Sequence, residues 1–216
     1  MLPKVNLFSV YVPNFNVIFK IMNDIPKKLI IDQTENYFDL LRKVHQDLKK
    51  ENPPDYLLFC YLSLCSATLE YSINWVFIDF CISKFGLDEY QTYAEAYLSN
   101  SFKSKLYLMP ITVTESKFRF NGNHKAIKTL EQLISRRNTM LHNKSFLKYI
   151  DVEIIKRTED EIESFNINNF KFNNLLISLC KKEVFDYGTA LGKLRRDFFD
   201  QYRNSSIKET DLIKRI

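Results

Sequence analysis

A stretch of about thirty residues with few charges, residues 55–86, constrains the fold of this 216-residue chain more than any other feature. It reads DYLLFCYLSLCSATLEYSINWVFIDFCISKFG and ends at Gly86, the residue type that most often terminates a helix. A helix so long and apolar must be covered, either by other helices or by a bilayer. Glu70, Asn74 and Asp79 lie in its second half, where a membrane would make a carboxylate costly. We therefore expect the central helix of a bundle and no membrane, with a transmembrane helix as the alternative.

Further helices are predicted around this central one. Only 4 glycines and 6 prolines occur, which favours long helices over a many-stranded sheet. One helix begins at the sequence DQTE, where Asp32 is the expected N-cap and Glu35 completes a capping box, and it ends before the prolines at 53–54. The other predicted elements are a helix over 87–109 ended by Pro110, a connector over 111–123, a helix over 124–142 and a long last helix over 168–204. In the last helix, the four-residue spacing of Gly188 and Gly192 predicts close packing against a neighbour.

The expected fold class is all-α, an antiparallel bundle of about five helices. Residues 1–31 are β-branched and aromatic but broken by prolines, which predicts an extended N-terminal arm in which short strands can form. The chain then divides into this arm (1–31), a helical domain (32–204) and a polar C-terminal tail (205–216). With 45% hydrophobic residues, the helical domain has ample material for one core.

The cysteines and histidines indicate neither disulfides nor a metal site. The cysteines are Cys60, Cys65, Cys81 and Cys180, and the histidines are His45, His124 and His142. No CxxC occurs and the histidines are far apart, so we expect no metal and no cofactor. The thiols are predicted to be small core side chains in a reduced, cytoplasmic protein.

Positive charge is concentrated in one part of the chain. Residues 101–148 contain ten Lys and Arg against two Glu, whereas the whole chain has a formal charge of +5. A local basic field favours a polyanionic partner. The alternative is a solvated helix face rich in lysine.

Two polar side chains interrupt apolar helix faces. At about 100° per residue, Arg137 falls within the apolar face of the helix over 124–142, and a buried guanidinium requires a partner. Glu70 lies on a narrow polar seam of the central helix and could hold Arg137, while Asn74 satisfies its other donors. Arg136 is predicted to point into solvent. A structural ion pair accounts for the same pattern, with His142 acting only as a cation at a helix end.

The sequence RRNTMLH, residues 136–142, resembles the RNxxxH motif of the HEPN domain family, whose members are helical bundles. Arg137, Asn138 and His142 occupy the motif positions. The stretch SATLEYSIN, residues 66–74, resembles the earlier HEPN helix, in which an acidic residue commonly faces the motif arginine. The resemblance covers residues 35–203, and the order of the helices also matches.

The resemblance implies a function, because many HEPN proteins are metal-independent endoribonucleases of toxin or phage-defence systems. It implies a homodimer with a composite site, RNA as the substrate, and an antitoxin or activator as a further partner. His142 would transfer protons, Arg137 would stabilise the phosphorane and Asn138 would orient the phosphate or the imidazole, leaving 2′,3′-cyclic phosphate ends. Glu70 and Asn74 would support the site, and Arg136 and Lys144 would contact RNA.

Two other interpretations of these residues remain open. One is a non-catalytic HEPN-like module that binds RNA, a nucleotide or a protein. The other is a structural helical dimer in which the Arg–Glu pair fixes the register.

Overall fold

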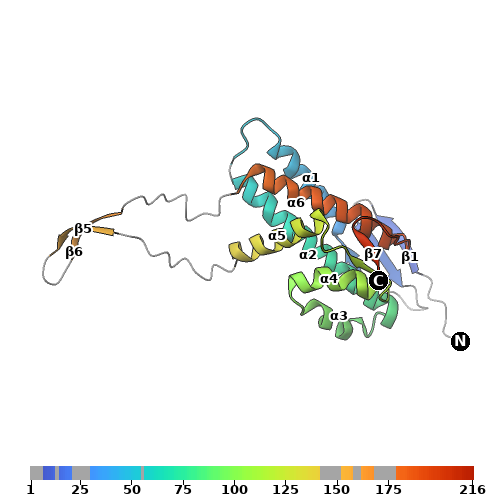
Figure 1. The fold of residues 1–216 in the computed structure, drawn as a ribbon. Helices are drawn as coiled ribbons and strands as arrows, with labels where there is room; N and C mark the ends of the chain where they lie inside the picture. Colours follow the sequence, from blue (N-terminus) through green and yellow to red (C-terminus); the bar gives the residue numbers. More distant parts are fainter. Residues whose placement is uncertain are drawn as a thin grey trace.

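The protein is mainly helical, as the sequence predicts (Figure 1). The computed structural model describes residues 7–12, 15–20, 30–54, 56–141, 152–157, 162–167 and 179–216, with side chains for 31–54, 56–140 and 179–216. The helices are α1 (Thr34–Leu48), α2 (Tyr56–Phe85), α3 (Tyr90–Leu98), α4 (Phe102–Val113), α5 (Lys125–Leu141), α6 (Lys181–Leu194), the π-helical segment η2 (Arg195–Phe199) and α7 (Asp200–Arg203). An all-α bundle is therefore the correct fold class.

Short strands accompany the helices. They are β1 (Leu7–Val12), β2 (Phe15–Lys20), β3 (Ile30–Asp32), β4 (Phe118–Phe120), β5 (Val152–Arg157), β6 (Ile162–Ile167) and β7 (Ile213–Arg215). Strands β1, β2 and β3 form an antiparallel sheet, so the predicted N-terminal arm does contain strands. Strands β5 and β6 form a separate antiparallel hairpin that the sequence did not predict.

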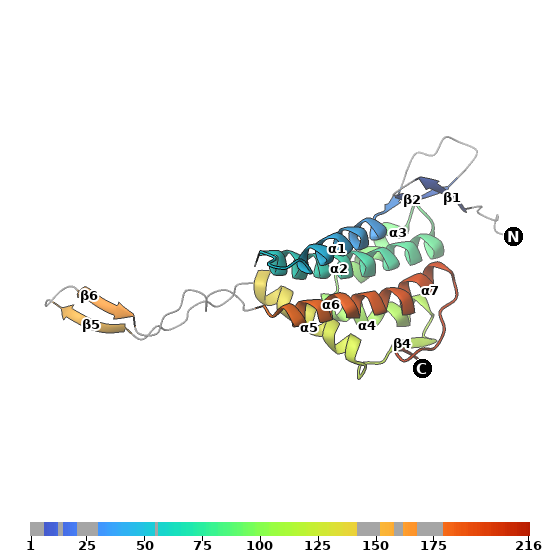
Figure 2. The ribbon, with the colours of Figure 1, turned by 90° about the horizontal axis from the view of Figure 1, so that it is seen from above.

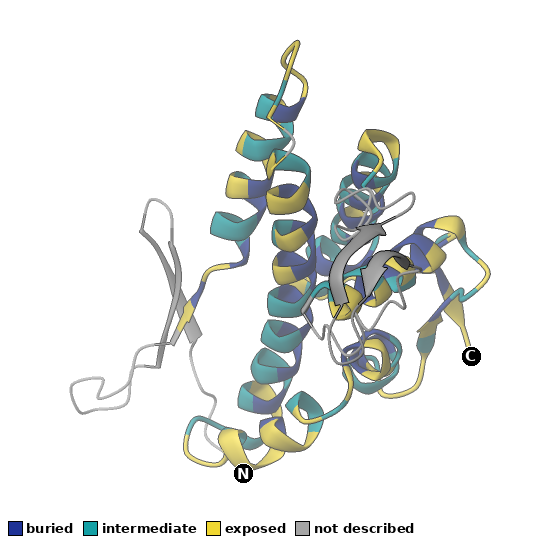
Figure 3. Cartoon of the chain, turned by 90° about the vertical axis from the view of Figure 1, so that its left-hand side faces the viewer, coloured by how far each residue is buried: buried dark blue, intermediate teal, exposed yellow. Residues whose placement is uncertain are grey.

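Helix α2 is the centre of the bundle. It contacts α1, α3, α4, α5 and α6, and Figure 2 shows α1 and α6 lying along it. Buried positions recur along its length, among them the fully buried Leu62, Leu69 and Phe77 (Figure 3). By length and composition alone α2 would pass for a membrane span, and 44% of its most apolar window is buried inside the protein. Its five helical neighbours account for that burial, as expected for a central helix.

The third predicted helix is in fact two helices, α3 and α4. The break lies at residues 99–101, where polar side chains cap both helices. At the end of α3, the side-chain amide of Asn100 donates to the Ala96 carbonyl (2.8 Å). At the start of α4, the Ser101 hydroxyl accepts from the backbone N–H of Ser104 (3.2 Å). The predicted stop at Pro110 is also wrong, because α4 continues to Val113. Pro110 is buried, and we attribute its tolerance inside the helix to that apolar burial, which offsets one lost backbone hydrogen bond.

The start of α1 also differs from the prediction. The helix begins at Thr34 after Gln33, and Asp32 Oδ1 accepts bonds from the Thr34 amide (2.8 Å) and hydroxyl (2.5 Å). Glu35 does not complete a capping box, because its carboxylate bonds to Arg195 and Arg203 instead. Tertiary ion pairs have replaced the local bond that the sequence suggested.

The C-terminal part departs from the prediction in three ways. The last helix begins at Lys181, and residues 168–178 of the predicted helix lie outside the described residues. Cys180 is exposed, as is Cys60, so only Cys65 and Cys81 are the core thiols expected. The segment 205–216 is not a separate polar tail: β7 pairs with β4, and Leu212 and Ile213 are fully buried. These two apolar side chains belong to the hydrophobic core of the helical bundle.

Close packing at Gly188 fixes α6 against α2. A Cβ atom at this position would lie 2.1 Å from the hydroxyl of Tyr61, so any larger residue would force the buried Tyr61 ring to move. That hydroxyl also lies 2.9 Å from Nδ1 of His45 on α1, which ties three helices together. The predicted close contact is thus confirmed at Gly188. It is wrong at Gly192, where a Cβ atom would have no neighbour within 4 Å.

Candidate functional site

Helix α5 carries the candidate arginine on its buried side. Ile127, Leu130 and Ile134 of this helix are buried in the core, and Arg137 follows them one turn later. Because the core ends there, the Arg137 side chain remains 25% exposed. The guanidinium therefore stands at the rim of the core, where it can meet both protein and solvent.

Glu70 of α2 holds this arginine. Arg137 Nη2 donates to Glu70 Oε2 at 3.2 Å, and Arg137 Nη1 donates to Oδ1 of the neighbouring Asn138 at 3.1 Å. The Glu70 contact is the pairing that the sequence predicted between two helices far apart in the chain, and it is confirmed. These two bonds fix the plane of the guanidinium.

A second cation, Lys105 of α4, completes the cluster. Its Nζ donates to Glu70 Oε1 (3.3 Å) and to Asn74 Oδ1 (2.8 Å), and only 5% of the side chain is exposed. The prediction that Asn74 would satisfy Arg137 is therefore wrong, since Asn74 serves Lys105. Sequence reasoning missed Lys105 even though it lies within the buried stripe of α4 formed by Phe102, Leu106 and Met109. A lysine inside an apolar stripe was the available signal, and it was the same signal that marked Arg137.

An aromatic ring lies against both cations. The centroid of the Phe102 ring is 5.9 Å from the Arg137 guanidinium carbon and 5.9 Å from Lys105 Nζ. Cations at this distance from a ring face are weakly attracted to it. Phe102 is itself buried, so it excludes water from one side of the cluster and strengthens the ionic contacts there.

The charges of this cluster do not balance. Among the described side chains in direct contact, two cations share the single carboxylate of Glu70, and Asn74 and Asn138 are neutral. The Arg137 guanidinium has five N–H donors, of which Glu70 and Asn138 occupy one each. The arrangement can therefore bind an anion at the rim of the core. No cluster of three or more His, Cys, Asp or Glu that could hold a metal occurs within the part of the chain that the structure describes.

Comparisons with family models, curated proteins and solved structures found no match. The candidate site is therefore defined by the geometry of the chain's own residues. We call these residues the Glu70 cluster, which comprises Glu70, Asn74, Lys105, Arg137 and Asn138.

Arg136 does not point freely into solvent, as the sequence predicted. Its Nε and Nη2 donate to the two oxygens of Glu183 on α6 (2.9 and 3.3 Å), although 40% of the side chain is exposed. The Tyr187 hydroxyl donates to the same carboxylate at 2.6 Å, and burial together with that carboxylate raises the pKa of Tyr187, which keeps the hydroxyl protonated. Arg136 thus joins α5 to α6, and the RNA contact expected of it stays a prediction.

Two predicted site residues, His142 and Lys144, lie outside the described residues. Helix α5 is described as far as Leu141, so Arg137 and Asn138 are in its last turns and the motif histidine is the next residue in the chain. The structure thus brings together Arg137, Asn138 and Glu70 as predicted, and it places Asn74 in the same cluster through Lys105.

Proposed function

We propose that this chain is a metal-independent endoribonuclease of HEPN type. The observation that supports the proposal most is the excess of positive charge in the Glu70 cluster, whose Asn138 precedes His142 by four residues in the chain. Phosphodiester cleavage places negative charge on the phosphorane oxygens, and fixed cations stabilise that charge better in the transition state than in the substrate. The reaction is attack of the ribose 2′-OH on the adjacent phosphorus, which leaves a 2′,3′-cyclic phosphate and a 5′-hydroxyl.

Each residue of the cluster has a distinct role in this proposal. Arg137 donates its remaining N–H groups to the phosphorane oxygens, because its planar fork matches two of them at once. Glu70 fixes the orientation of that fork but neutralises only one of the two cations. Lys105 balances Glu70, so that the charge of Arg137 stays available for the phosphate. Asn138 orients the phosphate or the imidazole.

His142 supplies the proton transfers. A histidine with a pKa near neutrality can remove the 2′-OH proton or protonate the leaving 5′-oxygen. The motif contains one histidine and the reaction has two proton transfers, so we propose a two-fold homodimer in which the second histidine comes from the other protomer. A toxin or phage-defence role in the cytoplasm, controlled by an antitoxin or activator, belongs to the same proposal.

A non-catalytic module is the second candidate function. The same charge excess favours it, because an anion can bind Arg137 without any contribution from His142. RNA, a nucleotide or an acidic protein segment would each satisfy that requirement. The two functions differ in whether the bound ligand is cleaved.

The test is incubation of purified protein with total RNA in EDTA, followed by analysis of the product ends. We expect the wild type to cleave and to leave 2′,3′-cyclic phosphates, and we expect His142→Ala to bind RNA without cleaving it. His45→Gln is the matched control, because His45 contacts Tyr61 in the core and has no part in the site. Binding without cleavage by a folded, dimeric wild type would favour the non-catalytic module. Cleavage by His142→Ala would contradict the assigned site.

A further inference from the structure

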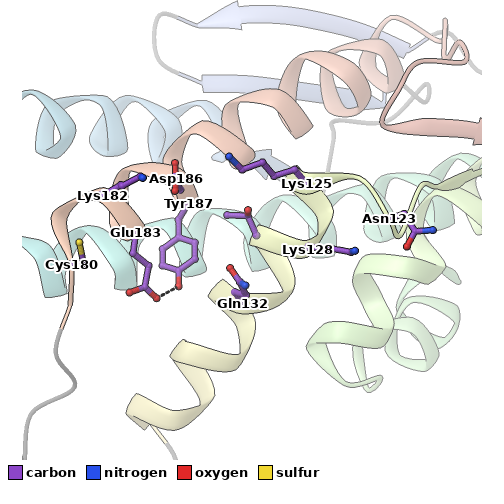
Figure 4. A pocket seen from close by; sticks show the side chains of 10 residues that line it. Asn123, Lys125, Lys128, Gln132, Cys180, Lys182, Glu183, Asp186 and Tyr187 are labelled. Atoms are coloured by element: carbon purple, nitrogen blue, oxygen red, sulfur yellow. Dashed lines mark hydrogen bonds between the residues drawn. The ribbon is translucent and has the colours of Figure 1, made fainter.

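A groove runs between α5 and α6 on the side of the bundle where Arg136 meets Glu183. It consists of two adjoining hollows of about 590 and 320 Å³, which share Lys125, Thr129 and Asp186 in their walls. Figure 4 shows the larger hollow, with Lys125 extending from the start of α5 toward Lys182 and Asp186 of α6. The Glu70 cluster does not line either hollow, so this feature is separate from the candidate site.

Basic side chains outnumber acidic ones in the walls of the groove. The basic side chains in its walls are His124, Lys125, Lys128, Lys182, Lys193 and Arg196, against the carboxylates of Glu183 and Asp186. Glu183 is neutralised by Arg136, and Lys193 is neutralised by Asp197 and Asp211. Within the described part of the chain, Lys125, Lys128, Lys182 and Arg196 form no ion pair. The groove therefore has an excess of positive charge that the fold itself does not use.

The groove is continuous with the exposed face of α5 that leads to the Glu70 cluster. Lys125, Lys128 and Gln132 line the groove and are exposed, and Ser135 and Asn138 are the next exposed positions on that side of the helix. From Lys125 to Asn138 the helix rises about 20 Å. A polyanion that lies in the groove can thus reach Asn138 and Arg137 without crossing the core.

We propose that the groove between α5 and α6 binds the phosphate backbone of a single RNA strand and guides it to the Glu70 cluster. This inference rests on the proposed function and specifies how its substrate is held. Lysine ammonium groups suit phosphates whatever the base sequence. The polar side chains of Asn123, Thr129 and Gln132 offer hydrogen bonds to ribose or bases. The length of the basic path favours a chain of several phosphates over a free nucleotide.

The experiment measures binding of a fluorescein-labelled oligouridine by anisotropy over a range of salt concentrations. All proteins carry His142→Ala, so the RNA stays intact and binding is measured independently of cleavage. The groove variant combines Lys125→Gln, Lys128→Gln and Lys182→Gln. The matched control combines Lys43→Gln, Lys49→Gln and Lys208→Gln, which are exposed lysines outside the groove and remove the same net charge.

We expect the groove variant to bind RNA at least tenfold more weakly than the control variant. Its slope of log affinity against log salt should be shallower by about 2, because each phosphate contact on a single strand contributes about 0.7. Equal losses of affinity in the two variants would overturn the inference, because RNA binding would then depend only on the overall charge of the protein. ATP binding that depends on the groove lysines, with RNA affinity unchanged, would also overturn it, since the groove would then hold a free nucleotide. Failure of the wild type to cleave RNA would refute the proposed function but not a groove-dependent loss of binding.

Discussion

The Glu70 cluster and the cluster around Glu35 are built from the same kinds of side chain but differ in charge balance. In the Glu35 cluster, Arg195 Nη2 donates to Glu35 (2.7 Å), and Arg203 donates to Glu35 and to Asp32 (3.2 Å for Asp32). Arg195 also lies over the ring of Phe38, 4.6 Å from its centroid. Arg195 Nε also lies 3.6 Å from Asp200 Oδ1. Two arginines thus meet three carboxylates, and the cluster joins the start of α1 to η2 and α7.

Burial does not distinguish these two clusters. The side chains of Arg137, Arg195 and Arg203 are 25%, 24% and 27% exposed. Charge does distinguish them, because the Glu70 cluster has one cation more than its carboxylate can neutralise. The comparison teaches that a half-buried arginine suggests function only when the cations of its cluster outnumber the carboxylates in contact with them. A cluster without an excess of cations, such as that of Glu35, is explained by stability alone.

Glu70→Ala should have the largest effect on stability. It leaves Lys105 nearly buried with only Asn74 as partner and leaves Arg137 without a carboxylate. We expect the free energy of unfolding to fall by about 3 kcal/mol in urea titrations followed by circular dichroism. Asp47→Ala is the control, because it removes only an exposed pair with Lys50 and should cost less than about 0.5 kcal/mol. Equal effects of the two substitutions would show that the Glu70 cluster is energetically unimportant.

Glu35→Ala should destabilise the protein by roughly 2 kcal/mol, because it removes the carboxylate that Arg195 and Arg203 share. Asp32 still pairs with Arg203, and Asp200 still lies 3.6 Å from Arg195. RNA cleavage, measured where both proteins are fully folded, should stay within about threefold of the wild type, since the Glu35 cluster has no catalytic role. A large loss of cleavage by folded Glu35→Ala would end the distinction between the clusters.

Lys105→Met should change the free energy of unfolding by no more than about 1 kcal/mol, because Glu70 then forms a single pair with Arg137. Cleavage should fall at least tenfold, since the positive charge available to the phosphorane is lost. Lys103→Met is the control on the same helix, where the lysine is 63% exposed and pairs with Glu131. Loss of stability without loss of cleavage would make Lys105 a structural residue.

Acidification probes the Glu35 cluster and should give the smallest change in stability of these tests. Burial acts to raise the pKa of Glu35, but the Arg203 and Arg195 guanidiniums outweigh it, and the pKa is lowered. A carboxyl group whose pKa is lower in the folded than in the unfolded state stabilises the fold at pH values above its unfolded pKa, about 4.5. This stabilisation is lost as the pH falls from the unfolded pKa through the folded pKa. Stability measured from pH 6 to 3 should therefore decline less steeply in Glu35→Gln than in the wild type. Identical slopes would contradict the ion pairs of this cluster.

The sequence alone predicted the central helix, α5 and the contact between Arg137 and Glu70. These succeeded for different reasons. A long apolar run indicates a central helix, the spacing of apolar residues identifies the buried face of α5, and a polar side chain on a buried face requires a partner. Lys105 was missed because α3 and α4 were read as one helix, which hid the apolar stripe that surrounds it. Arg136 and Glu35 were misread because their partners, Glu183, Arg195 and Arg203, come from segments distant in the chain. Local patterns do not determine such tertiary ion pairs.

The most direct test of the central claim compares Arg137→Gln with Arg203→Gln, two substitutions of equally exposed arginines. The measurement is the single-turnover rate of RNA cleavage in EDTA, at a temperature where wild type and both variants are fully folded. We predict that Arg137→Gln reduces the rate by at least about a hundredfold, as loss of a charge-stabilising donor does, and that Arg203→Gln leaves it within about threefold. Equal rates for the two variants, or a folded wild type that cleaves no RNA, would contradict the claim that the unbalanced cluster acts on phosphate.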